Sequence, residues 1–133
     1  MKTRFTVVLS MIAGAALGGA AIQALHAQAK PPVYVIGQID VTNEDGYAKE
    51  YAPKAAELIK AAGGRLLARR GAGGGASVTT IEREPYKGRL VVQQWESLDK
   101  VGAWHSSAAY QENRAIGNKY AKFRFVAVDG VAQ

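Results

Sequence analysis

The residues VYVIGQIDV, from Val33 to Val41, predict a β-strand, because β-branched side chains dominate them and polar side chains interrupt them only rarely. Apolar residues occupy both alternating sets of positions: Val33 and Val35 on one face are matched by Tyr34 and Ile36 on the other. A strand with one face in water would alternate between apolar and polar residues. We therefore expect a strand whose two faces are both covered.

Three more segments farther along the chain predict strands. RLLARR (Arg65 to Arg70) is the first, and RLVVQQWE (Arg89 to Glu96) and KFRFVAVDGV (Lys122 to Val131) show the same apolar pattern on both faces. SVTTIERE (Ser77 to Glu84) alternates like the return arm of a hairpin. With the preceding GAGGG it predicts a glycine-rich hairpin inserted after the second strand.

A helix is expected between the first two strands, with Thr42 as its N-cap. Apolar residues recur at steps of four and three along it and form one stripe: Tyr47, Tyr51, Ala55, Leu58 and Ala62. Pro53 interrupts the hydrogen-bond ladder and predicts a kink or a restart. Gly63-Gly64 predicts a left-handed C-terminal cap.

A second helical region is expected after Ser97, which caps its start. A break at Ser106-Ser107 precedes a further helix that runs to about Tyr120. The predicted order is β-α-β-β-α-β, an α+β ferredoxin-like fold with an antiparallel sheet.

The pattern on the strands also predicts a homodimer. Helices can cover only one face of the sheet, so the other apolar face calls for a second subunit packed sheet against sheet. The chain has no cysteine, and a domain this small must be held together by its core or by a partner subunit.

The beginning of the chain predicts a secretory signal peptide over residues 1–29. Lys2 and Arg4 form a basic n-region, an uncharged run extends from Phe5 to Leu25, and Ala27-Gln28-Ala29 fits a signal-peptidase site. An uncleaved membrane anchor is the alternative, but the run is rich in Ala and Gly and no basic stop-transfer cluster follows it. We expect a single domain over residues 30–133 that is periplasmic or secreted and has no stable membrane span after cleavage.

Charge and residue types exclude several kinds of site. Removal of Lys2 and Arg4 takes the net charge from +6 to +4. The sequence has no cluster of basic residues with interleaved aromatics, the pattern that would predict nucleic-acid binding. GAGGGA (Gly71 to Ala76) matches a loose dinucleotide fingerprint, but a strand-like segment follows it where the motif needs a helix. The single histidine after the leader cannot form a zinc site. No cofactor and no metal are therefore expected.

The segment AWHSSAAYQENR (Ala103 to Arg114) holds the strongest candidates for a small-molecule site. His105 and Tyr110 are candidate catalytic residues that could move a proton, and Arg114 shares a helix face with Tyr110. Trp95, Arg114 and Tyr47 are the candidate ligand-binding residues. Ordinary packing of Tyr110 and a solvated or capping role for His105 are the alternatives.

Four parts of the chain carry a resemblance to a family. VYVIGQIDVTNEDGYAKEY, AAGGRLLARRG, RLVVQQWESLDKVGAWHSSAAYQENR and the terminal FVAVDGV resemble the small bacterial family known as domain of unknown function 1330. The most specific parts are Gly63-Gly64, Trp95-Glu96-Ser97 and the Ser107-x-x-Tyr110-Gln111 element. The resemblance implies a dimeric α+β barrel, whose relatives include monooxygenases, haem-degrading enzymes and muconolactone isomerases. It implies no reaction, and His105 stands where an aromatic is common in the family.

Together these inferences predict an exported, homodimeric α+β domain of unassigned role that binds a small molecule between its sheet and its helices. The first alternative is an enzyme, either a monooxygenase or an isomerase, that is cofactor-free or haem-dependent. A structural or stress-related envelope protein is the second.

Overall fold

β1 (Val33–Val41) is one of the two inner strands of a four-stranded antiparallel sheet in the computed structural model of the protein. The order across the sheet is β2-β3-β1-β4, in which β2 spans Arg65–Arg69, β3 Arg89–Trp95 and β4 Ala121–Asp129. Gly37 of β1 lies opposite Val91 of β3 and Phe125 of β4. The four predicted strands that form this sheet are confirmed to within two residues at each end.

The structure describes residues 30–70 and 77–133, and Pro31–Gln133 form one compact unit. The predicted signal peptide (residues 1–29) and the GAGGGA segment (residues 71–76) lie outside the described residues. Among the helices that are described, none has the length and apolar character that crossing a membrane requires.

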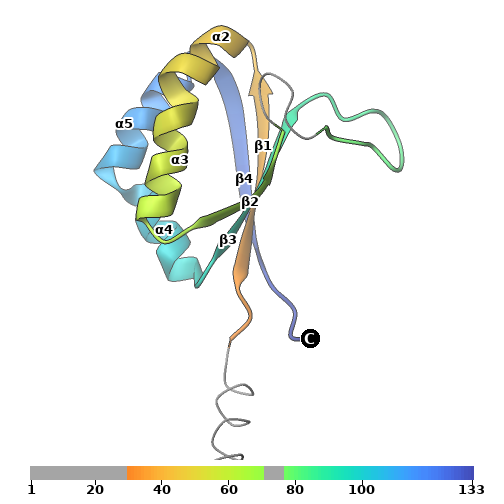
Figure 1. Ribbon diagram of the computed structural model, residues 1–133, viewed down its shortest axis with the longest axis vertical. Helices are drawn as coiled ribbons and strands as arrows, with labels where there is room; N and C mark the ends of the chain where they lie inside the picture. Colours follow the sequence, from red (N-terminus) through yellow and green to blue (C-terminus); the bar gives the residue numbers. More distant parts are fainter. Residues whose placement is uncertain (1–29, 71–76) are drawn as a thin grey trace, which may run out of the picture. The chain divides into compact units, whose positions relative to one another are not determined.

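The helices pack on one face of the sheet (Figure 1). The first helical run is continuous and consists of α2 (Glu44–Gly46), the π-helical η1 (Tyr47–Tyr51) and α3 (Ala52–Ala61). α4 (Leu98–Ser106) and α5 (Ala108–Gly117) follow β3. The element order agrees with the predicted α+β arrangement of strands and helices.

Helix starts are set by short polar side chains, and one expected cap is wrong. The Asn43 side chain, not that of Thr42, accepts a hydrogen bond of 3.0 Å from Gly46 N at the start of α2. Thr42 Oγ1 instead donates to the carbonyl of Tyr120 and ties the end of β1 to the turn before β4. Ser97 caps α4 as predicted, and Ser107 ends α4 and caps α5 at the predicted break.

The predicted restart at Pro53 and the predicted glycine cap are both found. α3 begins at Ala52, directly after the π-helical turn, so Pro53 lies in the first turn of α3. Gly63 has a φ of +94°, a left-handed conformation, and Gly64 N donates to the carbonyl of Ile59 over 2.9 Å. This cap turns the chain directly into β2.

The predicted return arm, Ser77–Glu84, is wrong, because this segment forms no strand. β2 pairs directly with β3, and the segment instead hydrogen-bonds locally. Tyr86 N donates to Thr80 Oγ1 over 2.7 Å, and the Tyr86 hydroxyl donates to the Arg89 carbonyl. Arg83 adopts a φ of 72°, which a continuous strand cannot contain. In Figure 1 the segment extends from the sheet on the side away from the helices.

Two clusters of buried residues lie between the sheet and the helices. The first contains Val33, Val35, Ile59, Trp95, Trp104 and Tyr110. The second contains Ile39, Tyr47, Tyr51 and Ala121. Gly117 allows α5 to approach closely, since a Cβ there would lie 2.6 Å from the ring of Tyr51.

No helix of the described chain covers the other face of the sheet (Figure 1). The strand register places these apolar side chains on that face: Tyr34, Ile36, Leu90, Val92, Val126 and Val128. Val126 is 46% exposed and Val128 is 54% exposed. We call these six residues the open face.

Candidate functional site

Aromatic side chains fill the space between β3, α4 and α5. The ring of Trp104 lies 5.2 Å from that of Trp95 and 4.6 Å from that of Tyr110. Trp95 is almost fully buried, and its Nε1 donates to Gln93 Oε1 over 2.8 Å. Trp95, a predicted ligand-binding residue, and Tyr110, a predicted catalytic residue, are therefore brought together in the first core cluster.

Tyr110 and Arg114 form a hydrogen-bonded pair on α5. Arg114 Nη1 donates to the Tyr110 hydroxyl over 2.9 Å, and Arg114 Nε donates to Asn118 Oδ1 over 3.1 Å. The guanidinium also lies 3.7 Å from the ring centroid of Phe123 on β4. Burial raises the pKa of Tyr110 and Arg114 partly offsets the rise, so this phenol is protonated at neutral pH.

His105 lies at the C-terminal end of α4 and its side chain is exposed. Its ring is 4.9 Å from that of Tyr110 and 6.2 Å from that of Trp104. The Trp104 indole N–H is buried and has no acceptor in the described part of the chain. His105, Tyr110, Trp95 and Arg114 thus gather at one end of the helical layer, but none of them lines the cavities described below.

Tyr47, the remaining candidate, lies at a different place and lines a groove between the first helical run and β2–β3. The groove has a volume of about 440 Å³. Small and apolar side chains from η1 and α3 form one wall, and arginines from the sheet form the other. Its lining residues are Tyr47, Ala48, Ala52, Pro53, Ala56, Arg69 and Arg89. A smaller hollow of about 70 Å³ shares Tyr47, Arg69 and Arg89 with it and also contains Ile59, Val91 and Arg70.

Arg89 is held in place from three sides. Its Nη2 pairs with Glu44 Oε2 over 2.6 Å, and its Nη1 donates to the carbonyl of Arg70 over 3.3 Å. Its guanidinium carbon lies 4.7 Å from the ring centroid of Tyr47. Only 12% of the Arg89 side chain is exposed, so the guanidinium is fixed at the edge of the groove.

Burial raises the pKa of Tyr47, and the nearby guanidiniums of Arg89 and Arg69 act in the opposite direction. The phenol is therefore protonated at neutral pH and is a hydrogen-bond donor. Together with Arg69 and Arg89 it supplies convergent donors beside the apolar wall of Ala52 and Ala56. This composition is typical of a site for a small organic molecule.

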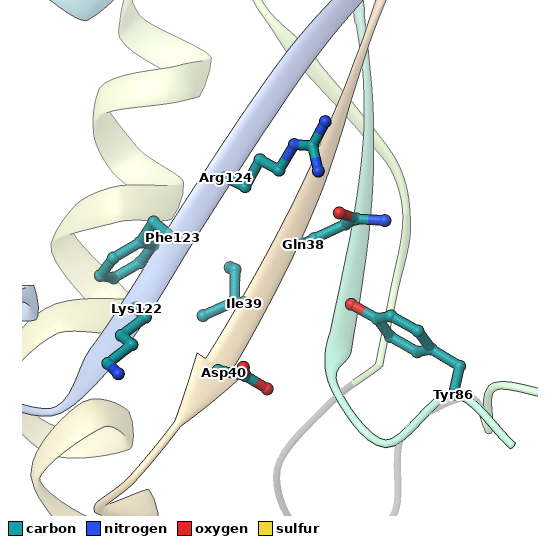
Figure 2. A pocket seen from close by; sticks show the side chains of 7 residues that line it. All are labelled: Gln38, Ile39, Asp40, Tyr86, Lys122, Phe123 and Arg124. Atoms are coloured by element: carbon teal, nitrogen blue, oxygen red, sulfur yellow. The ribbon is translucent and has the colours of Figure 1, made fainter. Parts of the chain in front are cut away.

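A third hollow, of about 260 Å³, lies at the edge of the open face, and Figure 2 shows the side chains that line it: Gln38, Ile39, Asp40, Tyr86, Lys122, Phe123 and Arg124. Burial and then the Asp40 carboxylate raise the pKa of Tyr86. In Figure 2 Tyr86 and Gln38 lie on the opposite side of the strands from Phe123, which points toward the helices. Carboxylate, ammonium and guanidinium groups share this hollow, so it has no single charge preference.

The family model for domain of unknown function DUF1330 matches residues 32–131 of this chain, almost the whole described unit. The chain belongs to the DUF1330 family. The predicted family resemblance is therefore confirmed. No curated protein matches the sequence.

Two solved structures similar to this DUF1330 chain, RPA0582 and SnoaB, belong to the dimeric α+β barrel fold. RPA0582, a protein of unknown function from Rhodopseudomonas palustris, superposes with a TM-score of 0.57 at 11% identity, over 85% of this chain and 94% of that chain. SnoaB, a cofactor-independent oxygenase from Streptomyces nogalater, superposes with a TM-score of 0.52 at 9% identity, over 77% of this chain and 96% of that chain. At these identities the likeness shows the fold alone.

Sequence reasoning missed Arg69 and Arg89 of the DUF1330 chain as candidate site residues. Both lie in predicted strands, but the face that each side chain occupies depends on the irregularity between Leu66 and Ala68 in the pairing of β2 with β3. Beyond that irregularity Arg69 lies opposite Val91, and Arg65, before it, lies opposite Gln94. Strict alternation along RLLARR would have placed Arg65 and Arg69 on the same face.

Proposed function

We propose that this DUF1330 protein is an exported homodimer that binds a small organic molecule in the groove lined by Tyr47, Ala56, Arg69 and Arg89. The observation that carries the proposal is the groove itself. Its volume of about 440 Å³ lies within the range of about 300 to 1,000 Å³ that is usual for small-molecule sites. An apolar wall with a few convergent donors is the composition that orients and holds such a ligand.

The homodimer is supported by the open face. Val126 and Val128 of β4 are exposed there in the single chain, the members from β1 and β3 are partly buried, and a second sheet packed at about 10 Å would cover all of them. A contiguous apolar surface of this kind is typical of an interface between subunits. The groove lies on the helical side of the sheet, so both copies of a sheet-to-sheet dimer would keep it accessible.

Export is supported by the sequence of residues 1–29. Intact-mass measurement of the protein from its own cells should show a chain that begins near Gln28 or Lys30. A chain that retains Met1 and is extracted only by detergent would instead indicate a membrane anchor.

The groove is tested with phenylnaphthylamine, an uncharged fluorescent probe that brightens in apolar sites. Ala56→Trp places a large side chain in the groove and should abolish probe binding. Ala61→Trp is the matched control, because Ala61 is exposed on the same helix and does not line the groove. If Ala56→Trp leaves binding unchanged, the groove is not the site. Native mass spectrometry of the mature protein from its own compartment is an independent test. It should detect a retained small molecule in the unmodified chain and none in Ala56→Trp.

A second candidate function is an enzyme in which His105 or Tyr110 moves a proton. One observation favours it: the buried indole N–H of Trp104 has no acceptor in the described chain and lies beside the rings of both residues. An unpaired buried donor is costly and is satisfied when a ligand or a water supplies an acceptor. The His105→Ala experiment in the Discussion separates this candidate from the first.

A further inference from the structure

The groove carries more positive charge than its surroundings neutralise. The chain has eleven Asp and Glu residues, and all of them lie in the described ranges. The ion pairs found there join Lys49 to Asp45, Lys54 to Glu57 and Arg89 to Glu44. Arg69 lines the groove and is in none of these pairs, so its guanidinium has no carboxylate partner in the described structure.

Glu44 is the replaceable member of its pair with Arg89. The Glu44 side chain is 65% exposed, so water can solvate its carboxylate when it leaves Arg89, whose own side chain is only 12% exposed. Arg70 lines the smaller adjoining hollow, and its carbonyl accepts a hydrogen bond from Arg89. The groove therefore has two guanidiniums, those of Arg69 and Arg89, and one paired carboxylate, and Glu44 is the group with which an incoming anion would compete for Arg89.

The remaining polar group favours an anion as well. The Tyr47 hydroxyl donates no hydrogen bond to any described residue, although its ring is buried between Arg89 and Tyr51. A protonated phenol is a donor that an anionic oxygen can accept from. Guanidinium groups bind carboxylates and related oxyanions with two parallel hydrogen bonds.

We propose that the ligand of this groove is an amphipathic organic anion, an aromatic or alkyl body that carries one carboxylate. The body contacts the Tyr47 ring, Ala52 and Ala56, and the carboxylate oxygens accept hydrogen bonds from Arg69 and Arg89. This inference rests on the proposed function, because it names the class of molecule that the same groove binds.

Two fluorescent probes with one scaffold test the charge preference. Anilinonaphthalene sulfonate carries an oxyanion that phenylnaphthylamine lacks, and the sulfonate stands in for the carboxylate. The titrations use the mature chain. The part of the fluorescence signal that Ala56→Trp removes is taken as binding in the groove, and the part that remains is taken as binding to the open face. We expect the anionic probe to bind about tenfold or more tightly than the neutral one, the value of one charge-assisted hydrogen bond.

Arg69→Gln should weaken groove binding of the anionic probe about tenfold and leave the neutral probe unchanged. Arg65→Gln is the matched control, because Arg65 lies on the same strand opposite Gln94, on the face away from the groove. Glu44→Gln should tighten binding of the anionic probe several-fold by releasing Arg89, and Asp45→Asn, beside it and paired only with Lys49, should not.

The outcomes separate the two proposals. If both probes bind with equal affinity and Ala56→Trp abolishes both, the groove binds small molecules and the inference of an anionic ligand is wrong. If Ala56→Trp changes neither titration, the proposed function and the inference are both overturned. If the anionic probe binds more tightly but Arg69→Gln and Arg65→Gln weaken its binding equally, the preference reflects net charge alone. That result also overturns the inference.

Discussion

Arg114 Nη1 lies 2.9 Å from the hydroxyl of Tyr110, four residues earlier on α5, while the same guanidinium rests on Phe123 of β4. One side chain thus satisfies a buried phenol and joins the helical layer to an edge strand of the sheet. The pair was predicted from the spacing of four, and the contact with Phe123 was not.

Removal of the Tyr110 hydroxyl should destabilise the domain. Tyr110 is 3% exposed, so Tyr110→Phe deletes a buried hydrogen bond and should lower the free energy of unfolding by about 1 kcal/mol. Urea denaturation of Tyr110→Phe, Arg114→Met and the double variant gives the coupling between the two groups. Additive losses in this cycle would show that the hydrogen bond contributes nothing.

Two glycines should respond to alanine in opposite directions. A Cβ at Gly64 would lie 2.5 Å from the Trp95 ring, whereas a Cβ at Gly102, inside α4, would meet nothing within 4 Å. Gly102→Ala should raise the free energy of unfolding by about 0.5 to 1 kcal/mol, since alanine favours a helix. Gly64→Ala should lower it by about 1 to 3 kcal/mol through overpacking. Equal denaturation midpoints for the two variants would contradict this packing.

Stability should fall in alkaline solution. Burial raises the pKa of Tyr47, Tyr51 and Tyr110 above the ordinary value of 10.0. As the pH rises, the unfolded state loses its phenol protons before the folded state does. The contribution of these phenols to the free energy of unfolding is therefore complete below about pH 10 and declines as the pH rises through the pKa values of the folded state. The decline is up to about 1.4 kcal/mol per pH unit for each phenol. Denaturation midpoints at about pH 8 and about pH 11 measure the decline, and Tyr51→Phe should make it shallower. A midpoint that does not change over this interval would show that the phenols are not desolvated.

A charge on the open face should separate the subunits of the proposed dimer. Val126→Asp changes a residue that is 46% exposed in the single chain, so it should leave the monomer folded and convert the dimer to monomer in light scattering. Leu98→Asp is the control, because Leu98 is 60% exposed on α4, in the helical layer. An unsubstituted chain that is already a stable monomer would contradict sheet-to-sheet packing.

His105→Ala should change little. The side chain is exposed, and a substitution at an exposed position usually alters stability by less than about 0.5 kcal/mol. Its binding of phenylnaphthylamine should equal that of the unsubstituted chain, because His105 does not line the groove. A folded, dimeric variant that loses turnover or haem binding would make the end of α4 an active site and would favour the enzyme.

Local signals in the sequence predicted most of the fold. The two-sided apolar pattern of Val33–Val41 and the serines at positions 97 and 107 act within a few residues, and the structure has each element where they indicate. The failures have longer-range causes. Ser77–Glu84 alternates like a strand, but β2 pairs with β3 and not with this segment, which hydrogen-bonds locally through Thr80 and Tyr86.

The helical stripe was predicted with Leu58 on it, whereas Ile59 is the buried residue. From Ala55 the buried face takes a step of four to Ile59 and not the predicted step of three to Leu58, although both steps lie on one face of an α-helix. Packing against the sheet decides between them, and no local pattern indicates it. The groove was missed for a similar reason, because Arg69 and Arg89 meet only through the register of two strands.

The contact between the rings of Trp95 and Trp104 has a practical consequence for spectroscopy. These are the only two tryptophans of the chain, and both lie in the first core cluster, 5.2 Å apart. Tryptophan emission therefore reports on that end of the core alone, while far-ultraviolet circular dichroism reports on the helices and strands of the whole domain. Unfolding curves recorded at the two signals will coincide only if the whole domain unfolds in one cooperative step, so the molecule contains its own internal test of two-state behaviour.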